Sequence, residues 1–361
     1  MLDKKLNRQN PLFHHSIIPI VYSFYHSNLE VLQMNTNRSI APPDAEVGQI
    51  KEAADRLLEN INRVIVGKKE TIQLVFIALL CEGHVLIEDV PGVGKTLLAK
   101  AMARSAGCRF MRIQCTPDLL PSDVTGIHYF NQKTSAFEFR PGPILANIVL
   151  VDEINRAMPR TQSSLLECMQ EQQVTVDLET VSLPRPFLIL ATQNPIELEG
   201  TFPLPEAQLD RFLLRVRLGY PEDGEEEAIL TRFHGANPME GLSSVLDAAA
   251  VLELQKRCRR VFVEDSVLRY MTDLTRATRG HEKIKLGASP RASLGLYLTC
   301  QAKAAIQGRD YVIPDDVKSL AVPVLSHRLI VKTEARMKGE TSEDILKEIL
   351  SAVPVPTEGK G

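Results

Sequence analysis

The stretch that decides the fold reads Asp89-Val90-Pro91-Gly92-Val93-Gly94-Lys95-Thr96. Residues 84–87 before it predict a short apolar strand, and residues 96–105 after it have the spacing of a helix. This order predicts a phosphate-binding loop, because the backbone N–H groups of such a loop and the N-terminus of a helix attract negative charge. We therefore expect the whole stretch to line the phosphates of a bound nucleotide.

Two side chains of the loop have expected roles of their own. Lys95 would reach the β- and γ-phosphates, and the Thr96 hydroxyl would bind Mg²⁺. The loop departs from the usual pattern, because Asp89 stands where a first glycine is expected. We expect Asp89 to adopt a backbone conformation with positive φ, which Asp does more readily than most residues. The alternative is a surface turn that contains Gly-Lys-Thr by chance.

A second apolar strand, residues 148–151, ends in two carboxylates. Asp152 would hold the Mg²⁺ through water, and Glu153 would polarise the water that attacks the γ-phosphate. The alternative is a strand followed by a helix cap, since Asp is a good N-cap residue. The presence of a phosphate-binding loop in the same chain favours the Mg²⁺ role over the helix cap.

A third strand, residues 187–191, leads to Asn194. Open α/β sheets bind ligands beyond the carboxyl ends of their strands, which is where Asn194 would lie. Its amide would orient the attacking water against the γ-phosphate. The alternative is a turn made by Asn194 and Pro195.

The wider pattern predicts an α/β domain followed by a helical domain. Extended segments at 109–114 and 213–218 alternate with helical patterns, which predicts a parallel sheet covered by helices. After residue 220 the pattern is helical, apart from a short strand at 328–331. We expect an N-terminal tail over 1–45, an α/β core over 46–220, a linker over 221–235, a helical domain over 236–350 and a tail over 351–361.

Composition limits the class of protein. The chain has 361 residues, 44% hydrophobic and 24% charged, which is typical of a soluble globular protein of about two domains. Its net charge of −3 argues against a nucleic-acid partner, although a local basic patch would survive that balance. No run approaches the roughly 20 apolar residues that span a bilayer. The six cysteines form no CxxC pair, so we expect a reducing, cytoplasmic location.

The first 33 residues differ from the rest of the chain. Their apolar stretch, residues 17–25, contains Pro19 and Ser23 and lacks the features of a signal peptide. We expect translation to start at Met34, so that the upstream residues are an artefact or a tail. The alternative is a short segment that binds a membrane surface or a partner.

Taken together, the motifs resemble those of AAA+ ATPases, and their fuller wording resembles the MoxR family of the helix-2-insert clade. The segments that carry the resemblance are 89–96, 118–126, 149–162, 172–174, 191–195, 209–212 and 289–291. The resemblance extends over about residues 47–349. It implies a P-loop parallel sheet sandwiched by helices and followed by a smaller all-α lid domain.

The resemblance also implies roles that spacing alone does not give. Arg211 matches the arginine finger that reaches the γ-phosphate of a neighbouring subunit, and Arg291 matches the second sensor arginine. An arginine supplied in this way can contribute a factor of about 10³ to 10⁵ in rate. The ordinary alternative is a local ion pair of Asp210 with Arg211, worth about 1 kcal/mol or less. The turn that ends in Val66 and Gly67 resembles the segment that packs against adenine.

Two predicted hairpins, residues 129–139 and 173–183, fall where this clade carries inserts. In ring ATPases such hairpins face the pore or the client; the alternative is surface decoration. The resemblance implies an ATPase that uses ATP and Mg²⁺, works as a homo-oligomeric ring, a hexamer, and remodels a protein client as a chaperone. Its implied partner carries a von Willebrand factor A domain. Two other classes stay open, a DNA-acting motor or initiator and a nucleotide-switched scaffold with little hydrolysis.

Overall fold

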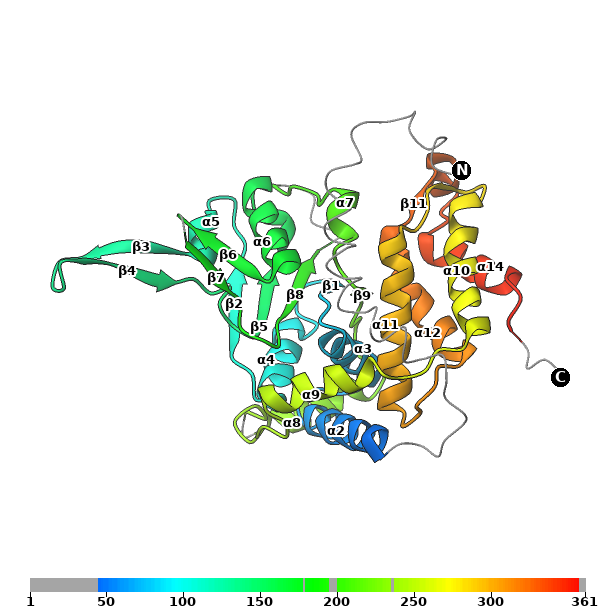
Figure 1. Ribbon diagram of the computed structural model, residues 1–361, viewed down its shortest axis with the longest axis horizontal. Helices are drawn as coiled ribbons and strands as arrows, with labels where there is room; N and C mark the ends of the chain where they lie inside the picture. Colours follow the sequence, from blue (N-terminus) through cyan, green and yellow to red (C-terminus); the bar gives the residue numbers. More distant parts are fainter. Residues whose placement is uncertain (1–44, 178, 195–199, 235–236, 357–361) are drawn as a thin grey trace, which may run out of the picture. The chain divides into compact units, whose positions relative to one another are not determined.

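A parallel sheet of five strands forms the centre of the α/β region (Figure 1). The computed structural model describes residues 45–177, 179–194, 200–234 and 237–356. The predictions for residues 1–44, including the start at Met34, and for Pro195 lie outside these residues. In sheet order the strands are β2 (Phe110–Gln114), β5 (Ile148–Asp152), β8 (Leu188–Gln193), β1 (Val85–Glu88) and β9 (Leu214–Val216).

Both faces of the sheet are covered by helices, which explains why its strands are continuously apolar. Alternate residues of β5 and β8 enter two different apolar cores. Ile148 and Leu150 pack in one core and Val149 and Val151 in the other. The first core contains α2 (Ala45–Asn62), α3 (Lys69–Leu80) and α4 (Lys95–Ser105), and the second contains α6 (Pro159–Glu171). The predicted fold, a parallel sheet between helices, is confirmed.

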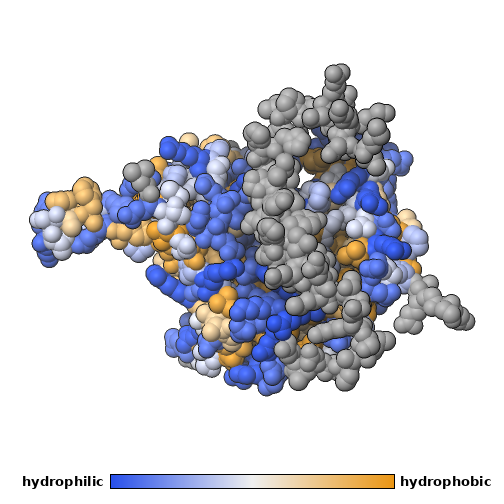
Figure 2. Space-filling view, in the orientation of Figure 1, coloured by the Kyte–Doolittle hydropathy of each residue, from blue (hydrophilic) through white to orange (hydrophobic). Residues whose placement is uncertain are grey.

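Two antiparallel hairpins extend from this α/β region, one at each predicted position. The first pairs β3 (Gly126–Asn131) with β4 (Ala136–Pro141), and the second pairs β6 (Gln173–Val176) with β7 (Glu179–Ser182). Figure 1 shows the β3–β4 hairpin reaching away from the sheet. Figure 2 shows apolar surface near its end, where Phe137 is 74% exposed and Phe130 is 51% exposed. Their rings meet edge to face, with centroids 5.4 Å apart.

The C-terminal part of the chain is mainly helical, as expected for a lid. Its helices are α8 (Glu225–Phe233), α9 (Ala248–Cys258), α10 (Asp265–Gly280), α11 (Pro290–Ile306), α12 (Pro314–Leu325), α13 (Thr333–Met337) and α14 (Ser342–Ala352). The predicted strand at 328–331 begins only at Ile330, because Ser326–Arg328 form a 3₁₀ turn. This strand, β11 (Ile330–Val331), pairs with β10 (Ile284–Leu286), which we did not predict.

Helices of this part pack on the α/β region. The Gln255 side chain of α9 donates a hydrogen bond to the Leu79 carbonyl of α3 at 2.7 Å, and Val251 and Leu254 belong to the core that contains α2 and α3. α11 also packs on α2 and α3, and within the lid it packs against α10 and α12, while α14 packs on α10 and α12 (Figure 1). No helix of the described residues is long and apolar enough to cross a membrane.

Candidate functional site

The predicted phosphate loop follows β1 directly and leads into α4. Gly92 and Gly94 have φ of 85° and 91°, a conformation that side-chain-bearing residues rarely adopt. Because of these two turns the chain reverses sharply, and α4 begins at Lys95. The Lys95 ammonium donates a hydrogen bond to the Asp89 carbonyl at 2.9 Å, so it lies across the loop that it belongs to.

The expectation of a positive φ at Asp89 is wrong. The described non-glycine residues with positive φ are Glu82, Ser135, Glu153, Gln172 and Asp177. Asp89 is instead buried, and its carboxylate accepts hydrogen bonds from the backbone N–H groups of Val90 at 2.9 Å, Leu218 at 2.6 Å and Gly219 at 2.7 Å. The first loop residue is therefore an acceptor that ties the loop to the segment after β9.

The two carboxylates after β5 are fixed by a threonine of the neighbouring strand. The Thr192 hydroxyl donates to Asp152 Oδ1 at 2.5 Å and accepts from the Glu153 backbone N–H at 2.8 Å. Glu153 has φ of 56°, so the chain turns sharply after Asp152. Sequence reasoning missed Thr192. The available signal was its place next to Gln193 and Asn194, at the polar end of an otherwise apolar strand.

Each of these carboxylates also has a partner on or near the edge strand β2. Arg112 pairs with Asp152, and Gln114 donates to Glu153 at 3.0 Å. Arg156 forms a further ion pair with Glu153 at 3.0 Å. The Glu153 carboxylate is thus held beside β5 in this state and would have to leave these partners before it could act on a water.

The strand order brings the predicted residues of three motifs together at the carboxyl ends of neighbouring strands. β8 lies between β1 and β5, so Asn194 lies between the phosphate loop and the carboxylates. Neighbouring strands are about 4.8 Å apart, so the ends of β1 and β5 lie roughly 10 Å apart, on either side of the end of β8. Residues that follow all three strands can therefore reach one phosphate group and its metal ion. Thr96 lies in the first turn of α4, directly after the loop.

The turn predicted to face adenine also contacts the segment after β9. Gly67 has φ of 75°, and the Glu225 carboxylate fills the space where a side chain at position 67 would lie. Lys68 donates to the Tyr220 carbonyl at 2.9 Å and pairs with Glu225 at 3.5 Å. Residues 217–225, called the connection below, therefore bind both the adenine turn and Asp89.

Arg211 lies at the opposite ends of the parallel strands from the phosphate loop. It stands between α7 (Glu206–Leu209) and β9. Leu213 donates to the His84 carbonyl, before the start of β1, at 2.8 Å. The rise of β1 between His84 and Asp89 is about 17 Å at roughly 3.3 Å per residue. Arg211 therefore cannot reach the phosphate loop of its own chain.

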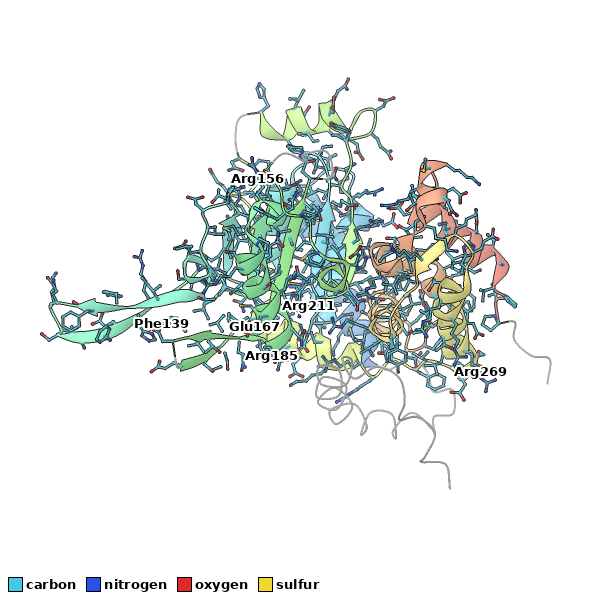
Figure 3. The ribbon with its side chains drawn as sticks, turned by 90° about the horizontal axis from the view of Figure 1, so that it is seen from above. Phe139, Arg156, Glu167, Arg185, Arg211 and Arg269 are labelled. Atoms are coloured by element: carbon cyan, nitrogen blue, oxygen red, sulfur yellow. The ribbon has the colours of Figure 1, made fainter. Side chains whose placement is uncertain are left out.

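Arg211 and Arg291 share one electrostatic environment although the sequence separates them widely. Burial lowers the pKa of Arg211, and the charge of Arg291 lowers it further. Glu167 and Glu171, on α6, oppose this effect on the pKa, and Figure 3 shows Arg211 beside Glu167. Asp210 has other partners than Arg211: it accepts from the Ser289 hydroxyl and pairs with Arg328.

Comparison with known proteins decides the family. A model of the ATPase family associated with various cellular activities (AAA) matches residues 84–214, and a model of the AAA lid domain matches residues 276–349. Chaperone MoxR1 of Mycobacterium tuberculosis is 41% identical to this chain, over 88% of this chain and 86% of that protein. The chain belongs to the MoxR family of AAA ATPases.

Other relatives agree with this MoxR assignment. The uncharacterized protein YeaC of Bacillus subtilis is 51% identical over 84% of this chain and 95% of its own length. A crystal structure of a protein from Cytophaga hutchinsonii superposes with a TM-score of 0.82 at 38% identity and covers 87% of this chain and 98% of that one. The AAA fold and its lid are thus shared over nearly all of the described chain.

Proposed function

We propose that this MoxR-family chain binds ATP with Mg²⁺ and hydrolyses it to ADP and phosphate. The observation that carries the proposal is the strand order, which gathers Lys95, Asn194 and Glu153 at one edge of the sheet. The nucleotide would contact Val66 and Gly67 with its base and the loop from Asp89 to Thr96 with its phosphates. The family to which the chain belongs supports ATPase chemistry in general.

Hydrolysis would depend on positioning and charge rather than on covalent chemistry. Lys95 would leave the Asp89 carbonyl for the β- and γ-phosphates. Glu153 would polarise the attacking water, and the amide of Asn194 would orient it. Asn194 and Glu153 directly follow the ends of β8 and β5, and Lys95 begins α4 after the loop that follows β1.

The proposed metal site fits the oxygen chemistry of the residues present. The Thr96 hydroxyl and the Asp152 carboxylate would hold Mg²⁺ together with phosphates and waters, which is how this ion usually binds. Within the described ranges no group of three or more His, Cys, Asp or Glu gathers as a metal cluster, and this kind of site needs none. When bound, Mg²⁺ neutralises charge on the phosphates.

The active unit in this proposal is a ring, with a hexamer as the expected size. Arg211 lies too far from its own loop to assist there, and Arg291 lies with Arg211. Both would therefore serve the ATP of the neighbouring subunit, Arg211 as the finger and Arg291 as the second sensor. Arginine donors suit the charge that develops on a transferring phosphoryl group.

The work of the ring would be chaperone-like remodelling of a protein client in the cytoplasm. A relative of this chain is named as a chaperone, which supports the general role. The exposed Phe130 and Phe137 on the β3–β4 hairpin give the chain an apolar surface on which a client segment could bind. A protein with a von Willebrand factor A domain is the expected partner.

Phosphate release by the purified full chain tests this proposal. We expect steady turnover with ATP and Mg²⁺, and none when EDTA removes the metal. A nucleotide-switched scaffold would bind ATP but release almost no phosphate in the same assay. A DNA-acting motor would show a salt-dependent rise in turnover on addition of DNA. Either of these results would contradict the proposed client-directed ATPase.

A further inference from the structure

One carboxylate joins the two arginine-bearing segments. Asp210 directly precedes Arg211, and its carboxylate oxygens accept from the Ser289 hydroxyl at 3.0 and 3.1 Å. Ser289 is the residue before α11, at whose first turn Arg291 stands. A single hydrogen-bonded contact therefore fixes the distance between a loop of the α/β region and the start of a lid helix.

The same carboxylate has a third contact, from deeper in the lid. Arg328 Nε lies 3.3 Å from Asp210 Oδ1, an ion pair whose angle is too poor for a hydrogen bond. The Arg328 side chain is only 2% exposed, and its Nη2 donates to the Phe212 carbonyl at 2.7 Å. His327 contacts the same carbonyl at 2.9 Å. The Asp210 side chain and the Phe212 backbone, on either side of Arg211, are thus both held from the lid.

Three arginines, Arg211, Arg291 and Arg328, gather near Asp210, and Glu167 and Glu171 of α6 act on Arg211 with the opposite charge. Burial lowers the pKa of Arg328 to about 10, Asp210 raises it, and Arg291 lowers it again. Arg211 feels the same repulsion from Arg291. Like charges held together out of water are costly, and an anion placed between them relieves that cost. The chemistry that fits such a place is a phosphate group.

We propose that Asp210 is a positioning residue that sets Arg211 and Arg291 as one unit toward the ATP of the neighbouring subunit. The proposal rests on the proposed function, because it needs ATP hydrolysis at a shared site. Asp210 itself does not touch the phosphate; it acts through the two arginines and through Ser289. The competing explanation is that Asp210 only ties the lid to its own subunit and so supports its own ATP site.

Mixing experiments separate these two explanations, because each variant damages one side of a subunit boundary. Asp210→Asn should lower phosphate release roughly 10- to 100-fold, since a small misplacement of a catalytic group costs this much. Its affinity for a fluorescent ATP analogue should stay near that of wild type. Mixed with Glu153→Gln it should regain activity, and mixed with Arg211→Ala it should not.

The competing explanation predicts the reverse pattern. If Asp210 supports its own ATP site, then Arg211→Ala subunits should rescue Asp210→Asn, and Glu153→Gln subunits should not. That result would overturn the inference, as would full activity of both Asp210→Asn and Ser289→Ala. Ser289→Ala is the milder second variant, because it removes one hydroxyl and leaves the pair of Asp210 with Arg328. Like Asp210→Asn, Ser289→Ala should regain activity when mixed with Glu153→Gln and not when mixed with Arg211→Ala. These mixtures test the inference if Asp210→Asn does not fold.

A matched control measures what the loss of a buried lid ion pair does by itself. Asp316 is buried and pairs with Arg309 at 2.7 Å, on α12. Asp316→Asn should lower the melting temperature as Asp210→Asn does, without joining the Arg211 complementation class. If wild type itself released no phosphate, the proposed function would fail. If wild type is active and only the mixing pattern differs, the inference alone is wrong.

Discussion

The Asp89 carboxylate accepts a hydrogen bond from the Leu218 backbone N–H at 2.6 Å, and one from Gly219 at 2.7 Å. The first residue of the phosphate loop is thereby bound to the start of the connection, whose Tyr220 and Glu225 contact Lys68 at the adenine turn. A glycine at position 89 would offer no acceptor. Asp89, which departs from the usual loop pattern, therefore makes a structural contact between the phosphate loop and the connection.

Loss of this contact should destabilise the fold. In Asp89→Gly the buried N–H of Leu218 loses its acceptor, and an unsatisfied buried donor costs about 1–3 kcal/mol. Urea unfolding should show a fall of that size in the free energy of unfolding. Asp123→Ala is the matched control, because it removes an exposed carboxylate that accepts from the Leu120 N–H, and it should have a smaller effect. Equal stability of Asp89→Gly and wild type would contradict the role assigned to Asp89.

Lys95→Ala should abolish tight ATP binding. The phosphates would lose the one ammonium of the loop, which now lies on the Asp89 carbonyl. Calorimetric titration with ATP measures the loss. Lys100→Ala, on the exposed face of the same helix, serves as the control and should bind normally. Retention of wild-type affinity in Lys95→Ala would remove the phosphate-loop assignment.

Thr192→Val should slow hydrolysis while ATP still binds. The valine keeps the shape of the side chain but loses the contacts with Asp152 and with the Glu153 N–H. Because these contacts set the carboxylates, we expect phosphate release to fall about 10²-fold. Thr192→Ser, which keeps the hydroxyl, should restore most of it. A valine variant with normal turnover would show that the carboxylates are positioned by other contacts.

His84 gives the fold a defined pH dependence. Burial lowers its pKa to about 4, although its contact with the Met169 carbonyl opposes the shift. The imidazole is neutral in the folded protein, whereas the unfolded chain protonates it near pH 6.5. The unfolded state thus binds more protons below pH 6.5, and stability should fall by up to about 3 kcal/mol as the pH drops toward 4.

Chemical denaturation of His84→Gln at several pH values checks this prediction. The glutamine cannot titrate, so its loss of stability between pH 6.5 and 4 should be smaller than that of wild type. Other titrating groups are common to both proteins and cancel in the comparison. Parallel pH profiles would show that His84 contributes nothing to the pH dependence.

Much of the fold could be predicted because local sequence determines it. The apolar run at 148–151 became β5, and glycines with positive φ mark the phosphate loop. A helix end can depend on one local contact: α9 begins at Ala248, where the Asp247 side chain caps it by accepting from the Ala250 N–H. The three-residue strand β10 has too little pattern to stand out from a helical sequence.

The parts of the site that could not be predicted depend on contacts between distant segments. The partner of Asp89 is more than a hundred residues away in the chain, and only the fold brings Arg211 to Arg291. Thr192 was missed because a hydroxyl at a strand end has no signature until its neighbour strand is known. Motif spacing identifies the type of chemistry, whereas the positioning contacts follow from topology.

Glu153→Gln should bind ATP and hydrolyse it very slowly, so that an ATP-bound ring accumulates. The amide that replaces the carboxylate can no longer accept a proton from the attacking water. Single-turnover measurements with a saturating amount of the variant should show bound ATP that persists. Rapid conversion to ADP in that assay would show that another residue positions the water.

The central claim is that each ATP site is shared, with Arg211 supplied by the neighbouring subunit. Its most direct test is phosphate release from mixtures of Arg211→Ala and Glu153→Gln at varied ratios, after subunit exchange has been confirmed. Mixing Lys95→Ala with Glu153→Gln is the control without gain, because both changes damage the same side of the boundary. The account predicts activity in the Arg211→Ala mixtures that neither parent has, with a maximum at intermediate ratios. A flat line at the parental level would contradict it.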